Sequence, residues 1–292
     1  GHEYSSAPGR LTEPLVRRQG ELKPATWDEA AAFIAERLKG LSGKDVGIAI
    51  RADSTLEEGV AAMALAEALG TGQVDHAPRP AAGVLPAREA ATLTDLATAD
   101  AILVVGDVTE EAGILDLRIK DALKGVTPPA LMAHGVPIAD LRLKERMPRR
   151  REILAVAAPY RVDLMRHAGA AARYPVAGEA AFFAALTRLA NDANATLSAE
   201  EEAAVGLSAP AARELVDRLA AAKNGVVVLG GFVLAGREAT AAARAFIKAV
   251  SVKEMPVGPM ANSYGLELLG VLPSHERYDY GGMIEGAKAL IV

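Results

Sequence analysis

The sequence predicts an α/β protein whose parallel β-sheets are covered by helices on both faces. Two observations lead to this fold class. Short apolar runs typical of buried strands alternate along the chain with longer segments that carry helix start and stop signals. Aromatic residues make up only 4% of the 292 residues, whereas apolar residues make up 51%. The core must therefore consist mainly of Ala, Leu and Val, which suits helices packed closely on a sheet.

Local signals define the first elements. Residues 1–25 are polar and rich in proline, and we expect them to form an irregular extended arm. Thr26 and Glu29 match a capping box, which predicts a helix that ends near Gly40. A short buried strand is expected at residues 46–50.

The alternation then continues to the end of the chain. Ser54 with Glu57 predicts the start of the next helix, which Gly70 closes. One apolar stripe is expected along this helix, formed by Leu56, Val60, Met63, Ala64 and Leu69. Further strands are predicted at 101–105, 152–157, 226–229 and 288–292. Further helices are predicted at 85–98, 110–124, 178–191 and 237–250, and two more begin at Ser198 and Ser208.

Composition excludes several classes of function. The net charge of −5 gives no electrostatic reason to expect nucleic acid as a partner. The chain has no cysteine, so these residues cannot form disulfides, thiolate metal sites, iron–sulfur ligands or a cysteine nucleophile. The uncharged run at residues 225–236 is too short to span a bilayer, and no direct membrane insertion is expected.

Glycine-rich turns are the nearest approach to a nucleotide-binding motif. Gly230-Gly231, followed by Gly236, comes after a predicted strand, but the spacing is not G-x-G-x-x-G. A tight structural turn is therefore the favoured interpretation. Gly106-Asp107 precedes a predicted helix and offers backbone amides to an anion. Asp107 or Thr109 as a helix cap explains that pattern equally well.

Histidine and glutamate positions add no convincing catalytic cluster. His76 and His134 are expected in loops without a second ligand at metal spacing, so we interpret them as structural. Glu200, Glu201 and Glu202 fall at a predicted helix start, where carboxylates interact favourably with the helix dipole. No catalytic, cofactor-binding or metal-binding residue is predicted in this chain.

The most unusual local feature is a basic run between residues 142 and 151. It contains six cations and a single acid, Glu145: Arg142, Lys144, Arg146, Arg149, Arg150 and Arg151. Such a run is a candidate docking patch for a phosphate, a polyanion or an acidic protein surface. The alternative is a solvated loop without a specific role. Met147-Pro148 within the run indicates a shaped loop.

Several segments resemble the molybdopterin oxidoreductases, in that family's order and across nearly the whole chain. They are residues 10–17, 24–30, 68–75 (Ala-Leu-Gly-Thr-Gly-Gln-Val-Asp), 99–107 and 262–273 (Asn-Ser-Tyr-Gly to Gly-Val-Leu-Pro). Residues 1–4, 134–137 and 144–150 further resemble the large iron–sulfur subunits of bacterial NADH–quinone oxidoreductases, respiratory complex I.

Departures from the family pattern bear on chemistry. The residue that would hold molybdenum in catalytic members falls at or beside Ala81, which has no ligand atom. The acidic residue that contacts a nucleotide half of the cofactor in such members falls at Ala158-Pro159. Both losses suit the complex I branch, which the resemblance implies to be without molybdenum.

The resemblance also implies a topology of two Rossmann-like domains, the second inserted into the first. Residues 1–75 would be an N-terminal arm and the first part of one domain, 76–275 the inserted domain, and 276–292 the return. In that arrangement residues 288–292 should pair in parallel with 46–50. Because the chain ends within a predicted strand, we expect it to be part of a longer protein.

The resemblance therefore predicts a non-catalytic scaffold and interaction region of the iron–sulfur subunit. Iron–sulfur clusters are expected elsewhere in the full-length subunit, with no cofactor in this chain. The expected partners are other subunits of the hydrophilic arm of complex I, at the cytoplasmic face of the cell membrane. The alternative is part of a catalytic molybdopterin oxidoreductase such as a formate dehydrogenase.

Overall fold

A computed structural model describes residues 7–80, 90–124 and 149–292. Its residues form two compact units. The first contains Gly1–Ile50, Glu57–Asp75 and Val271–Val292, and the second contains Arg51–Leu56 and His76–Gly270. In sequence, both segments of the second unit lie between the two ends of the first.

The first unit begins with a β-hairpin, which corrects the prediction of an irregular arm over residues 1–25. Strands β1 (Leu15–Arg18) and β2 (Glu21–Pro24) pair antiparallel. Gln19 and Gly20 have φ of 54° and 87° at the turn between them. A two-residue hairpin turn of type I′ has positive φ at both central positions, which Gly20 adopts without steric strain. The proline content of the segment obscured this signal.

Capping signals at the first helix are confirmed. In α1 (Trp27–Leu38), the Thr26 hydroxyl accepts from the Glu29 amide and the Glu29 carboxylate accepts from the Thr26 amide. Gly40, just after the helix, has a φ of 83°. Helix α2 (Leu56–Leu69) also ends as predicted, with Gly70 at a φ of 63°.

The buried face of α2 differs from the predicted apolar stripe. Leu56 and Val60 are about half exposed, and the buried positions are Gly59, Ala62 and Ala66. The helix is apolar on several sides, so periodicity does not identify one face. Small residues face the interior because they allow close packing.

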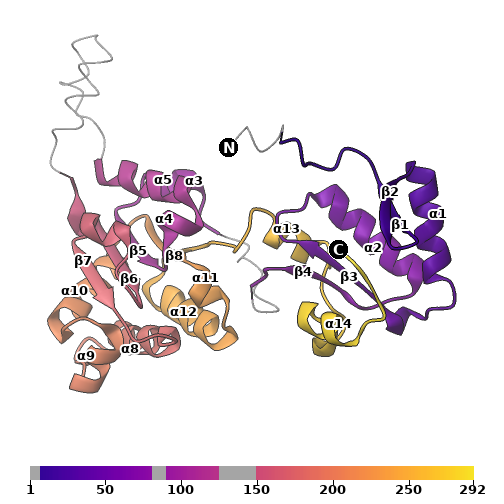
Figure 1. The fold of residues 1–292 in the computed structure, drawn as a ribbon. Helices are drawn as coiled ribbons and strands as arrows, with labels where there is room; N and C mark the ends of the chain where they lie inside the picture. Colours follow the sequence, from indigo (N-terminus) through magenta and orange to yellow (C-terminus); the bar gives the residue numbers. More distant parts are fainter. Residues whose placement is uncertain (1–6, 81–89, 125–148) are drawn as a thin grey trace, which may run out of the picture. The chain divides into compact units, whose positions relative to one another are not determined.

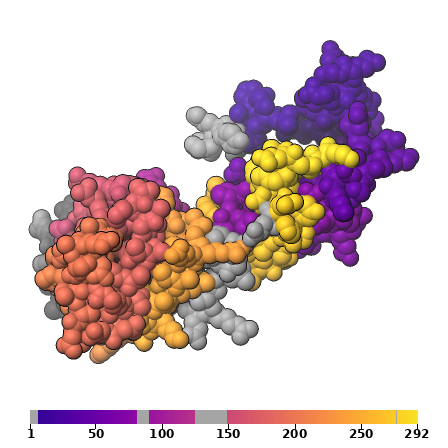
Figure 2. Space-filling view, turned by 90° about the horizontal axis from the view of Figure 1, so that it is seen from below, coloured from indigo at the N-terminus to yellow at the C-terminus, as the bar shows by residue number. Residues whose placement is uncertain are grey.

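A three-stranded sheet of order β10-β3-β4 forms the core of the first unit (Figure 1). Its strands are β3 (Val46–Arg51), β4 (Val74–Ala77) and β10 (Ala289–Ile291). The C-terminal strand pairs in parallel with β3, Ala289 opposite Val46 and Ile291 opposite Ile48. This confirms the predicted return of the C-terminal segment to the first sheet. In Figure 2 the C-terminal residues, in yellow, lie against purple residues from earlier in this unit.

The second unit contains a five-stranded parallel sheet of order β7-β6-β5-β8-β9. The strands are β5 (Ala101–Val105), β6 (Leu154–Ala158), β7 (Ala170–Arg173), β8 (Gly225–Leu229) and β9 (Lys253–Pro256). Every residue of β5, β6 and β8 is buried, as expected for parallel strands covered on both faces.

Helices cover both faces of this sheet, and alternate side chains of a strand enter separate cores. Leu103 and Val105 of β5 face one core with α8 (Glu179–Asn191), α9 (Ala199–Val205), α10 (Ala209–Ala220) and α12 (Arg237–Val250). Ile102 and Val104 face the other with α3 (Leu93–Ala97) and α5 (Gly113–Lys124). The predicted starts of α9 at Ser198 and α10 at Ser208 are confirmed.

Several boundaries differ from the sequence predictions. The helix expected at 85–98 is α3 in its described part, and residues 85–89 lie outside the described residues. The helix expected at 110–124 is divided into α4 (Val108–Glu111) and α5, because Ala112 has a non-helical φ of −154°. Strands β4, β7 and β9 were not predicted. Neither were the short helices α11 (Gly231–Leu234), α13 (Ser263–Leu268) and α14 (Tyr280–Gly286).

Candidate functional site

In this fold a ligand site is expected at the carboxyl edge of the five-stranded sheet. In open parallel sheets ligands bind beyond the strand ends where the strand order reverses. Here β5 lies between β6 and β8, so the turns that follow β5 and β8 meet at that point. The Gly230 amide donates to the Val105 carbonyl at 2.8 Å.

Two glycines allow these turns to approach each other. Gly106 has a φ of 133°, and a Cβ built on it would lie 2.9 Å from the Gly230 Cα. Real Cβ atoms essentially never approach another atom this closely. Neither atom could move away without a shift of the backbone. Gly106 and Gly230 therefore serve close packing of two turns, in agreement with the tight-turn interpretation of Gly230-Gly231.

A carboxylate of the protein itself lies where a nucleotide phosphate would be expected. Glu111, at the end of α4, accepts a hydrogen bond from the Gly231 amide with Oε2 at 2.9 Å. A fixed negative charge there opposes the binding of an anionic phosphate. Glu111 was not predicted as a site residue, because it is 120 positions away from Gly231 in the sequence.

Further carboxylates increase the negative charge at this edge. The Tyr160 hydroxyl donates to Asp107 at 3.4 Å, and its ring packs edge-on against Phe232. Burial, followed by the negative charges of Asp107, Glu111 and Glu110, raises the pKa of Tyr160. The three carboxylates Asp107, Glu110 and Glu111 thus disfavour a phosphate or another anion at this edge.

The two positions that depart from the family pattern lie in different parts of the chain. Ala158 is the last residue of β6, fully buried, and presents no side-chain acceptor to a ribose or a base. Pro159 follows it and has no backbone donor. Ala81 lies outside the described residues.

The remaining histidine, glutamate and cap residues singled out in the sequence contribute to the fold where the structure describes them. His76 lies in β4 and is fully buried, so its expected place in a loop was wrong; the strand was missed because it contains polar residues. His134 lies outside the described residues. Glu200 to Glu202 occupy the first turn of α9, as predicted. Asp107 is the residue before α4 but makes no side-chain cap, and the Thr109 hydroxyl bonds to Asp116. The expected cap is therefore absent.

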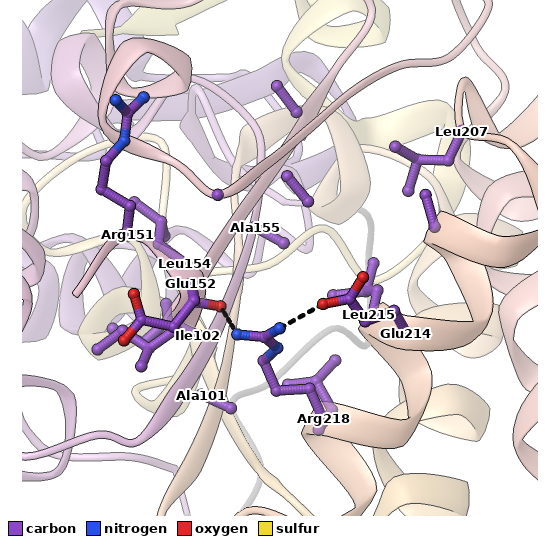
Figure 3. Close-up of a pocket in the computed structure, with 16 residues that line it drawn as sticks. Ala101, Ile102, Arg151, Glu152, Leu154, Ala155, Leu207, Glu214, Leu215 and Arg218 are labelled. Carbon is purple, nitrogen blue, oxygen red and sulfur yellow. Dashed lines mark hydrogen bonds and ion pairs between the residues drawn. The ribbon is translucent and has the colours of Figure 1, made fainter.

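A hollow of about 550 Å³ opens at the amino ends of β5, β6 and β7 (Figure 3). Its lining is largely apolar, and its central polar group is the guanidinium of Arg218. That group donates to the Glu152 carbonyl and to the Glu214 carboxylate, the latter at 2.6 Å. The first interaction joins α10 to η3 (Arg151–Ile153), the turn before β6, and the second lies within α10, so Arg218 is engaged in holding the fold together.

The basic run is partly described. Arg142, Lys144 and Arg146 lie outside the described residues. Arg149 and Arg151 are exposed at the entry to β6, with Arg150 half-buried between them. The Arg151 guanidinium donates to the carbonyls of Arg166, at 2.6 Å, and Ala168, at 3.2 Å. The basic patch thus continues from the run onto η4 (Asp163–His167). The sequence did not predict this continuation, because the two segments are not adjacent in the chain.

Glu267 in α13 is a buried carboxylate that the sequence did not single out. It is 4% exposed, and neither oxygen has a hydrogen-bond partner among the described residues. Burial raises its pKa, and the positive charge of Arg79 opposes that shift. The folded protein therefore holds the proton to higher pH than the unfolded chain. Stability contributed at low pH is lost as the pH rises above the ordinary carboxyl pKa of 4.5.

Glu267→Gln is accordingly expected to stabilise the protein in mildly alkaline solution. A buried charge without a partner costs about 1–3 kcal/mol, and the neutral amide avoids part of that cost. Urea denaturation at about pH 8 should show an increase of about 1 kcal/mol, which shrinks toward pH 4.5. The exposed Glu238→Gln is the matched control and should show no such trend. A constant difference at all pH values would contradict the explanation.

The part of the chain that the structure describes has neither a metal-ligand cluster nor a helix suited to span a membrane. Within residues 7–80, 90–124 and 149–292, no group of three His, Cys, Asp or Glu side chains is arranged to hold a metal ion. Among the helices of the same residues, none has the length and apolar character needed to cross a bilayer.

Comparison with known proteins supports the predicted resemblance. Residues 10–130 match the family model of the molybdopterin oxidoreductases. NADH-quinone oxidoreductase subunit 3 of Thermus thermophilus is 40% identical over 301 residues, which cover 99% of this chain and 36% of that protein. The alpha subunit of F420-dependent formate dehydrogenase 2 of Methanococcus maripaludis is 36% identical over 158 residues, or 49% of this chain and 23% of that protein.

The chain thus spans little more than a third of the length of its Thermus relative. Among solved structures, a chain of the formyltransferase/hydrolase complex of Methylorubrum extorquens, determined with methylofuran, superposes with a TM-score of 0.60. It covers 95% of this chain and 75% of that one, at 18% identity. This likeness concerns the fold alone. The sequence-based resemblance and the mixed α/β fold with parallel sheets are confirmed.

Proposed function

Because residues 10–130 belong to the molybdopterin oxidoreductase family and nearly the whole chain is similar to an NADH–quinone oxidoreductase subunit, we propose that it is a non-catalytic scaffold region of such a subunit. Its role is to support electron transfer from NADH to quinone by clusters held elsewhere in the subunit. It contacts other subunits of the hydrophilic arm, at the cytoplasmic face of the membrane. The basic run from Arg142 to Arg151 is one of its contact surfaces.

One observation carries the non-catalytic part of the proposal. The Glu111 carboxylate accepts the hydrogen bond of the Gly231 amide at the carboxyl edge of the sheet. A nucleotide phosphate bound there would need that amide as a donor. Ala158 offers no acceptor at the end of the neighbouring strand β6. Both features disfavour a pterin dinucleotide cofactor at this edge, and no catalytic step is assigned to it.

The alternative is a catalytic molybdopterin enzyme that acts on formate. Similarity to the Methanococcus formate dehydrogenase subunit favours it. That similarity covers about half of the chain, against nearly all of it for the NADH–quinone oxidoreductase subunit. The negative charge of Glu111 and the apolar Ala158 disfavour it on physical grounds.

Elemental analysis and nucleotide titration distinguish the two functions. We expect the purified chain to be colourless and to hold no stoichiometric iron or molybdenum, since it has no cysteine to ligate iron and Ala81 has no ligand atom for molybdenum. We expect no saturable heat of binding with GDP, which represents the nucleotide half of the cofactor. Stoichiometric molybdenum, or saturable binding of GDP that Ala158→Asp strengthens, would favour the catalytic alternative.

A further inference from the structure

A second hollow, of about 450 Å³, lies beside the edge strand β7 and is rimmed by arginines. Its lining comes from the segment after β6, from β7 and from the end of α9: Arg161, Met165, Arg166, Ala171, Arg173 and Gly206. Among residues 7–80, 90–124 and 149–292, no carboxylate lines it. β7 is the first strand in the sheet order and pairs with β6, so its other side faces away from the sheet (Figure 1).

Strand geometry places one of these arginines on the open face. Ala172 is buried in the core on one side of β7, whereas Ala171 and Arg173 are exposed on the other. Side chains alternate along a strand, so Ala171 forms a flat floor beside the Arg173 guanidinium. At one end the hollow is closed by Gly206, whose backbone packs on that of Arg173.

Two of the three guanidiniums have no carboxylate counter-ion within the described part of the chain. Arg161 and Arg173 are exposed and form no ion pair with any described residue. The third, Arg166, forms an ion pair of 2.9 Å with Asp163, the acidic residue of η4. Three cations therefore surround one hollow and only one of them is neutralised locally. Such an arrangement is complementary to a negatively charged partner.

The hollow is continuous with the described end of the basic run. Arg151 donates to the carbonyl of Arg166, so the two groups adjoin. The pKa of His167 is lowered mainly by burial and further by the positive charges of Lys120, Arg166 and Arg149. The negative charge of Asp163 opposes this shift. Lys120 is itself paired with Asp116 at 2.6 Å. Positive charge thus extends from Arg149 to Arg173 over one surface.

The chemistry of this surface favours an extended protein segment over a small anion. All three arginines of the hollow are exposed, and a single ion pair at an exposed site contributes little. An extended acidic segment can form several pairs together and exclude water between them. It can also lie along the open side of β7, as peptides do at sheet edges.

We propose that the hollow lined by Arg161, Arg166 and Arg173 is a docking site for an extended, carboxylate-rich segment of a partner subunit. This rests on the proposed function, which it deepens by giving the partner's chemistry. The guanidiniums pair with carboxylates of that segment, and the floor at Ala171 accommodates its backbone.

Charge-reversal variants of equal net charge test the site. Fluorescence anisotropy would measure binding of a labelled deca-glutamate peptide to the chain and to R161E/R173E, R149E/R150E and K223E/K248E. Lys223 and Lys248 are exposed and lie outside the basic surface, so K223E/K248E is the matched control. R161E/R173E is expected to weaken binding by about tenfold, and the control by much less. The same substitutions in the complete subunit would be scored by its co-sedimentation with the assembled complex.

Each outcome decides a separate point. Equal weakening of peptide binding by all three variants would overturn the docking site and attribute binding to net charge. Unchanged binding by R161E/R173E would also overturn it and attribute binding to another surface. Tight binding of inorganic pyrophosphate without binding of the peptide would also overturn it. If R149E/R150E alone impairs assembly, the scaffold function stands without this site. If the unsubstituted subunit fails to join the complex, the proposed function itself fails.

Discussion

Gly106→Ala is expected to lower the free energy of unfolding of the second unit by about 3 kcal/mol or more. The φ of 133° at Gly106 is strained for any residue with a side chain. The new Cβ would also lie 2.9 Å from the Gly230 Cα, and a backbone atom cannot rotate away. Urea denaturation followed by far-UV circular dichroism measures the loss, and hydrogen exchange at β5 and β8 locates it.

Gly270→Ala separates the two contributions. Gly270 belongs to the same unit and has a φ of 82°, but a Cβ there would meet nothing within 4 Å. Its replacement should cost only the conformational strain, about 1–2 kcal/mol. If Gly106→Ala proves no more harmful than Gly270→Ala, the close approach of the two turns contributes nothing to stability.

Elements with strong local signals could be predicted from the sequence. The capping box at Thr26 and the start of α9 at Ser198 depend on residues only three positions apart. The runs that form β5 and β8 are apolar throughout because both of their faces are covered. Local chemistry alone determines such elements.

The missed strands lack that signal. Strand β4 reads Val-Asp-His-Ala, and its two polar residues are buried by neighbours far away in the sequence. Strand β7 reads Ala-Ala-Ala-Arg, which is as compatible with a helix as with a strand. Both strands exist because a sheet edge was available for pairing. Their prediction requires the tertiary fold.

The same limit applies to the candidate site. The basic run is visible in the sequence because its residues are adjacent, whereas Arg161, Arg166 and Arg173 join it only through η4 and β7. Glu111 meets Gly231 only because β5 and β8 are neighbours in the sheet. Charge clusters formed by folding have no sequence pattern.

Removal of residues 287–292 is expected to destabilise the first unit far more than the second. The deletion removes β10, whose ladder pairs Ala289 to Ile291 with Val46 to Ile48, and the preceding Lys288, whose amide donates to the Asp45 carbonyl. Val46 and Ile48 of β3 are 2% and 1% exposed and would lose their cover on one side. Several backbone hydrogen bonds at about 1 kcal/mol each would be lost together with apolar burial.

Hydrogen exchange with mass spectrometry can measure this difference within one molecule. Amides of Val46 to Arg51 should exchange much faster after the deletion, while those of β8 stay protected as in the intact chain. Lys288→Ala is the control, since it removes only the ion pair of 2.7 Å to Asp45. The Lys288 hydrogen bond, followed by hydrogen bonds from Ser42, lowers the pKa of Asp45, but the pair is exposed and contributes little to stability. Equal loss of protection in β3 and β8 would mean that the units unfold together. Unchanged protection in β3 would mean that β10 is dispensable for the stability of the strand with which it pairs.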